Sequence, residues 1–62
     1  MILDICFVND SPEQIQNVRM ISVYPHADGG LPAEVIIHSR DYTTPRRNIE
    51  LEYLKTIVIT ND

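Results

Sequence analysis

The residue types best suited to recognition chemistry are concentrated in one segment, residues 40–47, of this 62-residue sequence. The segment holds three of the five basic residues and a tyrosine that has polar neighbours: Arg40, Tyr42, Arg46 and Arg47. Arginine can bind a carboxylate or a phosphate through two parallel hydrogen bonds, and tyrosine offers a stacking face and a hydroxyl at low entropic cost. Both residue types are enriched at the energetic centres of protein interfaces, and together they can also hold single-stranded nucleic acid. We therefore predict that this segment contacts a partner, a protein in the first instance and a nucleic acid as the alternative.

Two carboxylates that follow this segment, Glu50 and Glu52, are the second group of interest. At alternate positions of a strand they would share one face about 7 Å apart, which is close to the separation of a glycosidase pair. A catalytic pair also needs a walled cleft that raises one of the two pKa values, and a chain of this size cannot build such a cleft alone. We therefore expect no enzymatic activity and assign both residues to an acidic, partner-binding face.

The remaining reactive side chains do not form a catalytic or metal-binding pattern. Cys6 lies in the middle of an apolar alternating stretch, where a free cysteine behaves as a small buried apolar residue. His26 and Asp28 belong to a turn, and His38 lies near the far end of the hairpin predicted there, too distant for a shared metal. The glycines in residues 29–32 lack the lysine and hydroxyl that a phosphate-binding loop needs after them. The sequence therefore predicts no catalytic residue, no metal and no cofactor.

Charge and composition limit the range of partners. Nine acidic residues against five basic ones give a net charge of −4, which argues against bulk affinity for nucleic acid or for an anionic membrane. A content of 44% hydrophobic and 23% charged residues is typical of a globular domain, and no apolar run approaches the length of a membrane span. The sequence predicts a single small, free-standing domain over residues 1–62. Its single cysteine and the lack of a basic leader favour a cytoplasmic location.

Alternation of apolar and polar residues predicts most of the secondary structure. Strands are expected over residues 2–8, 18–25, 33–39 and 55–60, and the middle two are expected to form a hairpin. The sequence Ser-Pro-Glu-Gln at residues 11–14 is a helix-start signature, which predicts one or two helical turns over residues 12–17. Residues 40–48 are expected to be an extended loop or an edge strand.

The segment of residues 49–59 is compatible with two structures. In the first, a strand is followed by a 3-10 turn around residues 51–54 and by a final strand. In the second, a helix is capped by Asn48 and turns Leu51, Leu54 and Val58 toward the core. The run of β-branched residues at its end favours the first structure.

These elements predict a mostly β fold, a small SH3-like or half-open barrel of four to five short strands with one short helical turn. The alternative is an α+β fold with a C-terminal helix. Closure is favoured because it removes exposed sheet edges. Nine residues are expected in the core: Leu3, Ile5, Phe7, Ile21, Val23, Val35, Ile37, Ile57 and Ile59.

A fold of this kind does not fix a function, so the function is predicted from size, charge and residue types. We expect a non-enzymatic, small acidic protein-binding module that docks on a larger partner, as an adaptor or an inhibitor such as a phage-encoded antagonist. The first alternative is a small barrel that binds nucleic acid through the Arg40–Arg47 loop. The second is a structural subunit that forms a homodimer by pairing edge strands, with residues 2–3 and 57–59 as the candidate interface.

Overall fold

The computed structural model describes residues 1–25 and 33–61 of the chain. Within these residues the structure is mostly β, as predicted, with six strands instead of the four to five expected. The strands are β1 (Ile2–Phe7), β2 (Glu13–Ile15), β3 (Val18–Tyr24), β4 (Glu34–Ser39), β5 (Arg47–Glu50) and β6 (Leu54–Thr60). The one helical element among them is a single 3-10 turn, Leu51–Tyr53, between β5 and β6.

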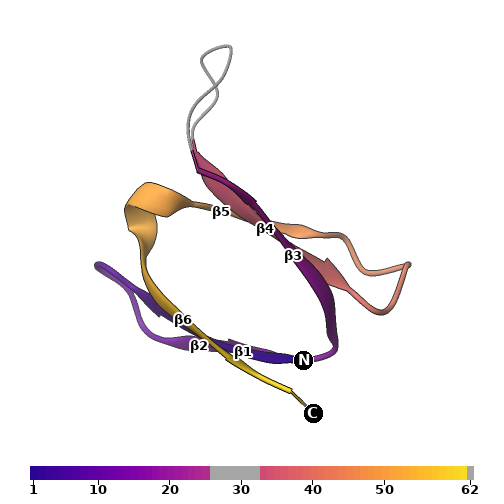
Figure 1. Ribbon diagram of the computed structural model, residues 1–62. Helices are drawn as coiled ribbons and strands as arrows, with labels where there is room; N and C mark the ends of the chain where they lie inside the picture. Colours follow the sequence, from indigo (N-terminus) through magenta and orange to yellow (C-terminus); the bar gives the residue numbers. More distant parts are fainter. Residues whose placement is uncertain (26–32, 62) are drawn as a thin grey trace.

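The strands form two three-stranded antiparallel sheets that face each other (Figure 1). One sheet has the order β2-β1-β6 and the other has the order β3-β4-β5. The 3-10 turn carries the chain from the second sheet back to the first, so the two ends of the chain meet in the antiparallel β1–β6 pair. Within the described residues the sheets do not close into a barrel.

Backbone hydrogen bonds join the two sheets at one corner and hold the 3-10 turn in place at the other. At one corner Met1 and Val18 exchange two bonds, of 2.9 Å from the Met1 amino group and 3.1 Å from the Val18 N–H. At the other corner the Leu51 N–H donates to the Ala33 carbonyl at 2.9 Å, and the Val8 N–H donates to the Tyr53 carbonyl at 3.0 Å. The Met1–Val18 bonds link the two sheets directly, whereas the other two bonds continue the β4–β5 and β1–β6 pairings into the 3-10 turn that connects the sheets.

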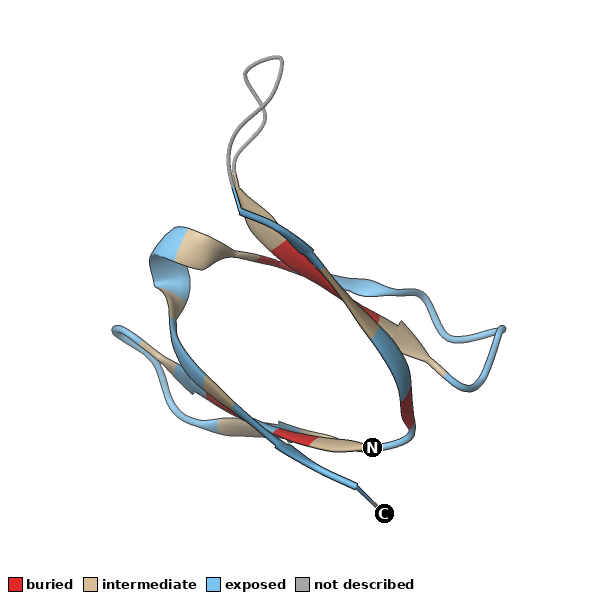
Figure 2. Ribbon diagram, in the orientation of Figure 1, coloured by how far each residue is buried: buried red, intermediate tan, exposed pale blue. Residues whose placement is uncertain are grey.

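The core lies between the two sheets and is thin, as expected for this chain length (Figure 2). It consists of Leu3, Ile5, Val18, Val35, Ile37 and Ile49. Three predicted core residues, Phe7, Ile21 and Ile57, are half-buried and pack against it. Two others are wrong, since Val23 is 57% exposed and Ile59 is 56% exposed. Both belong to strands that form a sheet edge, where one side of the strand has no neighbour to cover it.

A register shift between Val18 and Met20 decides which face of β3 is buried. In a regular strand Val18 and Ile21 would point to opposite faces, because side chains alternate. The bulge inserts one extra residue, so both side chains reach the core.

The helical turn predicted over residues 12–17 is wrong. Glu13–Ile15 form the edge strand β2 and pair with β1, Leu3 lying opposite Ile15 and Ile5 opposite Glu13. Pairing with β1 gives these residues a sheet partner and packs Ile15 against the core, which outweighs the helix-start signature of residues 11–14. Asn17, with a φ of 60°, then turns the chain into β3, a conformation that asparagine tolerates better than most residues.

The strand–turn–strand structure predicted for the C-terminal segment is confirmed, and a helix over residues 49–59 is wrong. Residues 40–48 are divided between a turn and a strand. A turn at Asp41–Thr44 is closed by the Thr44 N–H donating to the Asp41 carbonyl at 3.1 Å, and β5 begins at Arg47.

The prediction that Cys6 is buried is also wrong. Cys6 is exposed on the outer face of its sheet, opposite Thr56 of β6. His26, Asp28 and the glycines of residues 29–32 lie outside the described residues. In the part of the chain that the structure describes, no helix is both long and apolar enough to cross a membrane.

Candidate partner-binding groove

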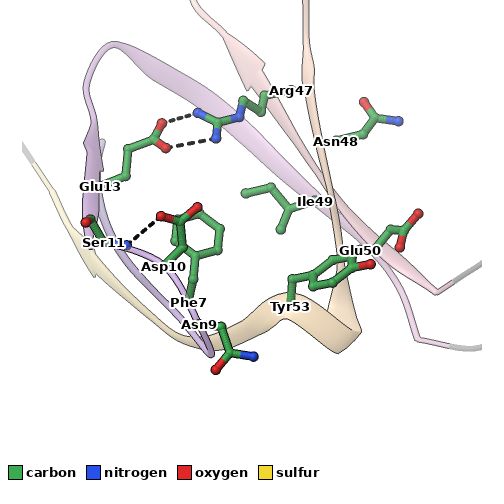
Figure 3. A pocket seen from close by; sticks show the side chains of 10 residues that line it. All are labelled: Phe7, Asn9, Asp10, Ser11, Glu13, Arg47, Asn48, Ile49, Glu50 and Tyr53. Carbon is green, nitrogen blue, oxygen red and sulfur yellow. Dashed lines mark hydrogen bonds and ion pairs between the residues drawn. The ribbon is translucent and has the colours of Figure 1, made fainter.

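A groove of about 760 Å³ lies between the β1–β2 loop on one sheet and β5 with the 3-10 turn on the other (Figure 3). Its apolar floor is Phe7, Ile49 and Tyr53, and its polar rim includes Asp10, Glu13, Arg47 and Glu50. We call this the inter-sheet groove. Its lining residues come from two segments far apart in the chain, residues 7–13 and 47–53, so it exists only when both sheets are formed.

Strand pairing positions two of the floor residues, and the 3-10 turn positions the third. Phe7 ends β1 and lies opposite Leu54, just past a register shift in the β1–β6 pair. Ile49 of β5 lies opposite the buried Val35 and is itself only 6% exposed. Tyr53 ends the 3-10 turn and remains 58% exposed, so an aromatic ring is available to a ligand at the mouth of the groove.

One end of the groove is closed by an ion pair between the two sheets. The Arg47 guanidinium donates two hydrogen bonds to the Glu13 carboxylate, the Nη2–Oε1 bond being 2.8 Å long. The hydrogen bonds from Arg47 hold the pKa of Glu13 below its ordinary value, and the same bonds raise the pKa of Arg47. The two side chains are 47% and 36% exposed, so the pair is largely solvated. It orders the rim and leaves little net positive charge in the groove.

The other end of the groove is acidic. A hydrogen bond with Glu52, together with the negative charges of Glu52 and Glu34, raises the pKa of Glu50. The charges of Glu52 and Glu50 also raise the pKa of Tyr53, because they oppose formation of a tyrosinate. No cation forms an ion pair with these carboxylates within the described residues. A positively charged group placed here would relieve the repulsion among them.

Glu50 and Glu52 therefore come together in a different way from the one the sequence predicted. They do not lie on one face of a single strand, because Glu50 ends β5 and Glu52 belongs to the 3-10 turn. The turn places Glu52 near enough to Glu50 to raise the pKa of Glu50. The two carboxylates therefore form one acidic group, with Glu50 lining the groove and Glu52 beside it.

The other predicted site residues, Arg40, Tyr42 and Arg46, lie in the β4–β5 turn and do not line this groove. Tyr42 is 83% exposed, and the Arg19 guanidinium lies over its ring at 5.2 Å from the centroid. The carboxylate of Asp41 accepts bonds from Thr43 and Thr44, which lower the pKa of Asp41. The arginine already occupies one face of the tyrosine, so only the opposite face is available for stacking.

Of the predicted site, the structure thus places Arg47 and Glu50 in the groove, with Glu52 beside it. The sequence interpretation missed Asp10, Glu13 and Tyr53 as site residues. Tyr53 could have been identified from the sequence because it is next to Leu54. Of two adjacent large apolar side chains at the end of a turn, one must point outward.

The remaining titratable residues of the described part of the chain do not add a reactive centre. The imidazole of His38 shares a 3.1 Å hydrogen bond with the Ser22 hydroxyl across the β3–β4 pair. Among the described residues, no three histidine, cysteine, aspartate or glutamate side chains are arranged to hold a metal ion.

The groove therefore combines an aromatic and aliphatic floor with a group of carboxylates at one end. Comparisons with known protein families, with curated proteins and with solved structures find no match to this chain.

Proposed function

We propose that this protein is a non-enzymatic protein-binding module, and that the inter-sheet groove receives a segment of a larger partner. The segment carries an apolar side chain next to a lysine or an arginine. The apolar side chain lies on Phe7, Ile49 and Tyr53, and the basic group lies against Glu50 and Glu52.

The observation that carries this proposal is the direct adjacency of an exposed aromatic ring and two mutually repelling carboxylates. Tyr53 is 58% exposed on the floor, and the pKa of Glu50 is raised by its contact with Glu52. Burying an aromatic side chain at an interface is a main source of binding energy, and a basic group at this position also removes a like-charge repulsion. The net charge of −4 supports the same choice, because it attracts a basic partner over a longer range.

The proposal is tested by selecting ligands from a random peptide display library and measuring the affinity of the selected peptides by calorimetry. We expect an apolar residue followed or preceded by lysine or arginine in the selected sequences. Tyr53→Ala is expected to weaken binding by about tenfold or more, which corresponds to about 1.4 kcal/mol.

Two further variants distinguish this groove from other surfaces. The double variant Glu50→Gln, Glu52→Gln is expected to weaken binding and to reduce its dependence on salt, because it removes the charges that attract the basic residue. Tyr42→Ala serves as the matched control, since it removes an exposed tyrosine from the β4–β5 turn outside the groove, and it is expected to leave the affinity unchanged.

The dependence of binding on pH follows from the raised pKa of Glu50. Because the basic residue of the peptide favours the ionised carboxylate, affinity should increase as the pH rises through that pKa. Selected peptides without a basic residue, or binding that is lost with Tyr42→Ala and retained with Tyr53→Ala, would contradict the proposed site. Tight binding of single-stranded oligonucleotides would favour the nucleic-acid alternative instead.

A further inference from the structure

Strand β6 forms a sheet edge that is open along its length. It pairs with β1 on one side, and on the other side no described residue pairs with it. After Lys55, it consists of five consecutive β-branched residues without charge, residues 56–60. Val58 and Ile59 are 58% and 56% exposed. An edge of this kind presents unpaired backbone donors and acceptors together with apolar side chains, and favours pairing with another strand.

The other three sheet edges each carry a feature that discourages such pairing. Strand β2 has three residues and follows Pro12, and β5 has four residues of which two are charged. Strand β3 contains the bulge between Val18 and Met20 and ends at Tyr24, directly before Pro25. Short strands, charges, bulges and prolines are the usual means by which sheet edges are protected, and residues 56–60 have none of them.

The sequence of this edge is self-complementary. Residues 56–60 read Thr-Ile-Val-Ile-Thr, which is the same in both directions. Two copies related by a twofold axis at Val58 and paired antiparallel would place each threonine opposite a threonine and each isoleucine opposite an isoleucine. Val58 would lie opposite itself. In every pair, both residues have odd numbers or both have even numbers. The backbone N–H and C=O groups of successive residues point to alternate sides of a strand, so the groups that point away from β1 in one copy would meet the corresponding groups of the other.

We propose that the protein forms a twofold-symmetric homodimer by antiparallel pairing of β6 with β6 of a second copy, centred on Val58. The two sheets β2-β1-β6 join into one six-stranded sheet. This edge contact is separate from the inter-sheet groove and holds whether or not the groove binds a peptide.

The pairing gives the half-exposed apolar residues of β6 the neighbours that they lack in one copy. On the core-facing side, Leu3 is opposite Ile59 in the β1–β6 register, and Ile59 then lies opposite Ile57 of the second copy. Ile57 of that copy is in turn opposite its own Ile5, so an apolar row crosses all four strands. On the outer side the pairs are threonine with threonine and valine with valine, both of which stabilise antiparallel sheets.

The distribution of charge makes β6 a more favourable place for contact between two copies than the rest of the surface. Two copies that each carry a net charge of −4 repel each other, but residues 54–61 contain no carboxylate and have one base, Lys55. Lys55 lies opposite Asn61 in the proposed register and so meets no like charge. Added salt screens the general repulsion and should strengthen the dimer, whereas salt should weaken the binding of a basic peptide in the groove.

A disulfide placed on the twofold axis tests the register. Residues directly opposite in an antiparallel pair have Cα atoms about 4.5–5.5 Å apart, a separation that a disulfide can span. In a Cys6→Ser background, Val58→Cys is expected to give a covalent dimer under mild oxidation. Val23→Cys is the matched control, because Val23 is a valine of equal exposure on the edge of the other sheet, and it is expected to remain monomeric.

The mass of the unmodified protein in solution tests the dimer itself. Light scattering over a series of concentrations is expected to show a transition from the chain mass of 7.1 kDa to twice that value. Val58→Lys places two like charges opposite each other and should raise the dissociation constant by about tenfold or more, whereas Val23→Lys should not change it. A protein that remains monomeric up to millimolar concentration, or a Val23→Cys variant that cross-links as fast as Val58→Cys, would overturn the proposal.

Discussion

The ion pair between Arg47 and Glu13 joins the edge strands of two different sheets, so its contribution to folding can be measured directly. The pair has bidentate geometry, which is the favourable arrangement for arginine and a carboxylate. Its side chains are 47% and 36% exposed, however, and water screens most of the attraction. We expect an interaction free energy of about 0.5–1 kcal/mol, in the upper part of the range for surface pairs and well below that of a buried pair.

The measurement is a double-mutant cycle of Arg47→Met, Glu13→Gln and the combined variant, with the free energy of unfolding taken from urea denaturation at low salt. Arg46→Met is the control, because Arg46 is an exposed arginine next in the chain and no ion pair is found for it among the described residues. The control should change stability by a smaller amount, and its effect should add to that of Glu13→Gln.

The pH dependence gives the cycle a second result. The pKa of Glu13 is lowered in the folded protein, so the stabilisation by the pair is present above the ordinary glutamate pKa. It is lost as the pH falls through the lowered pKa of the folded state. An interaction energy indistinguishable from zero at neutral pH, or one that does not change on acidification, would refute this account of the pair.

Further predictions concern the core, the β4–β5 turn and the acidic end of the groove. Leu3→Ala should cost about 2–5 kcal/mol of unfolding free energy, because Leu3 is fully buried, whereas Ile59→Ala should cost about 1 kcal/mol in dilute solution. Urea denaturation of both variants checks this difference. Asp41→Ala should accelerate amide hydrogen exchange at Thr43, whose N–H donates to the Asp41 carboxylate at 2.9 Å. The pKa of Glu50 is raised in the folded protein, so the contribution of Glu50 to stability falls as the pH rises through that pKa. Glu50→Gln should therefore raise the urea denaturation midpoint at neutral pH and make the midpoint less dependent on pH.

The sequence predicted those parts of the fold that depend on local patterns. Strands β1 and β3 alternate with period 2, β4 has a central run of apolar residues, and the β-branched residues 56–60 favoured a strand over a helix at that end of the chain. Strand β2 was missed because three residues are too few for a period, and its helix-start signature is overridden by pairing with β1. The bulge in β3 has no local signature, so the burial of Val18 alongside Ile21 could not be predicted.

The candidate site was predicted in part, for a related reason. Arg47, Glu50 and Glu52 were identified by residue type and by their closeness in the sequence. The partner of Arg47 is Glu13, which is 34 residues away and reaches it only through the packing of one sheet on the other. The exposure of Cys6 depends in the same way on which face of β1 the second sheet covers.

The pairing of β1 with β6 has a consequence for the time course of folding. Strands β3, β4 and β5 are consecutive in the chain and pair with their sequence neighbours. The β1–β6 pair instead joins the two ends of the chain, with Ile2 opposite Thr60. Bringing distant residues together carries the larger loop-closure entropy, so the β1–β6 pair is expected to form late and to limit the rate of folding. Until then the uncharged residues 56–60 are exposed along both edges. The folding chain is thus most prone to aggregation at the segment that stays partly open in the folded molecule.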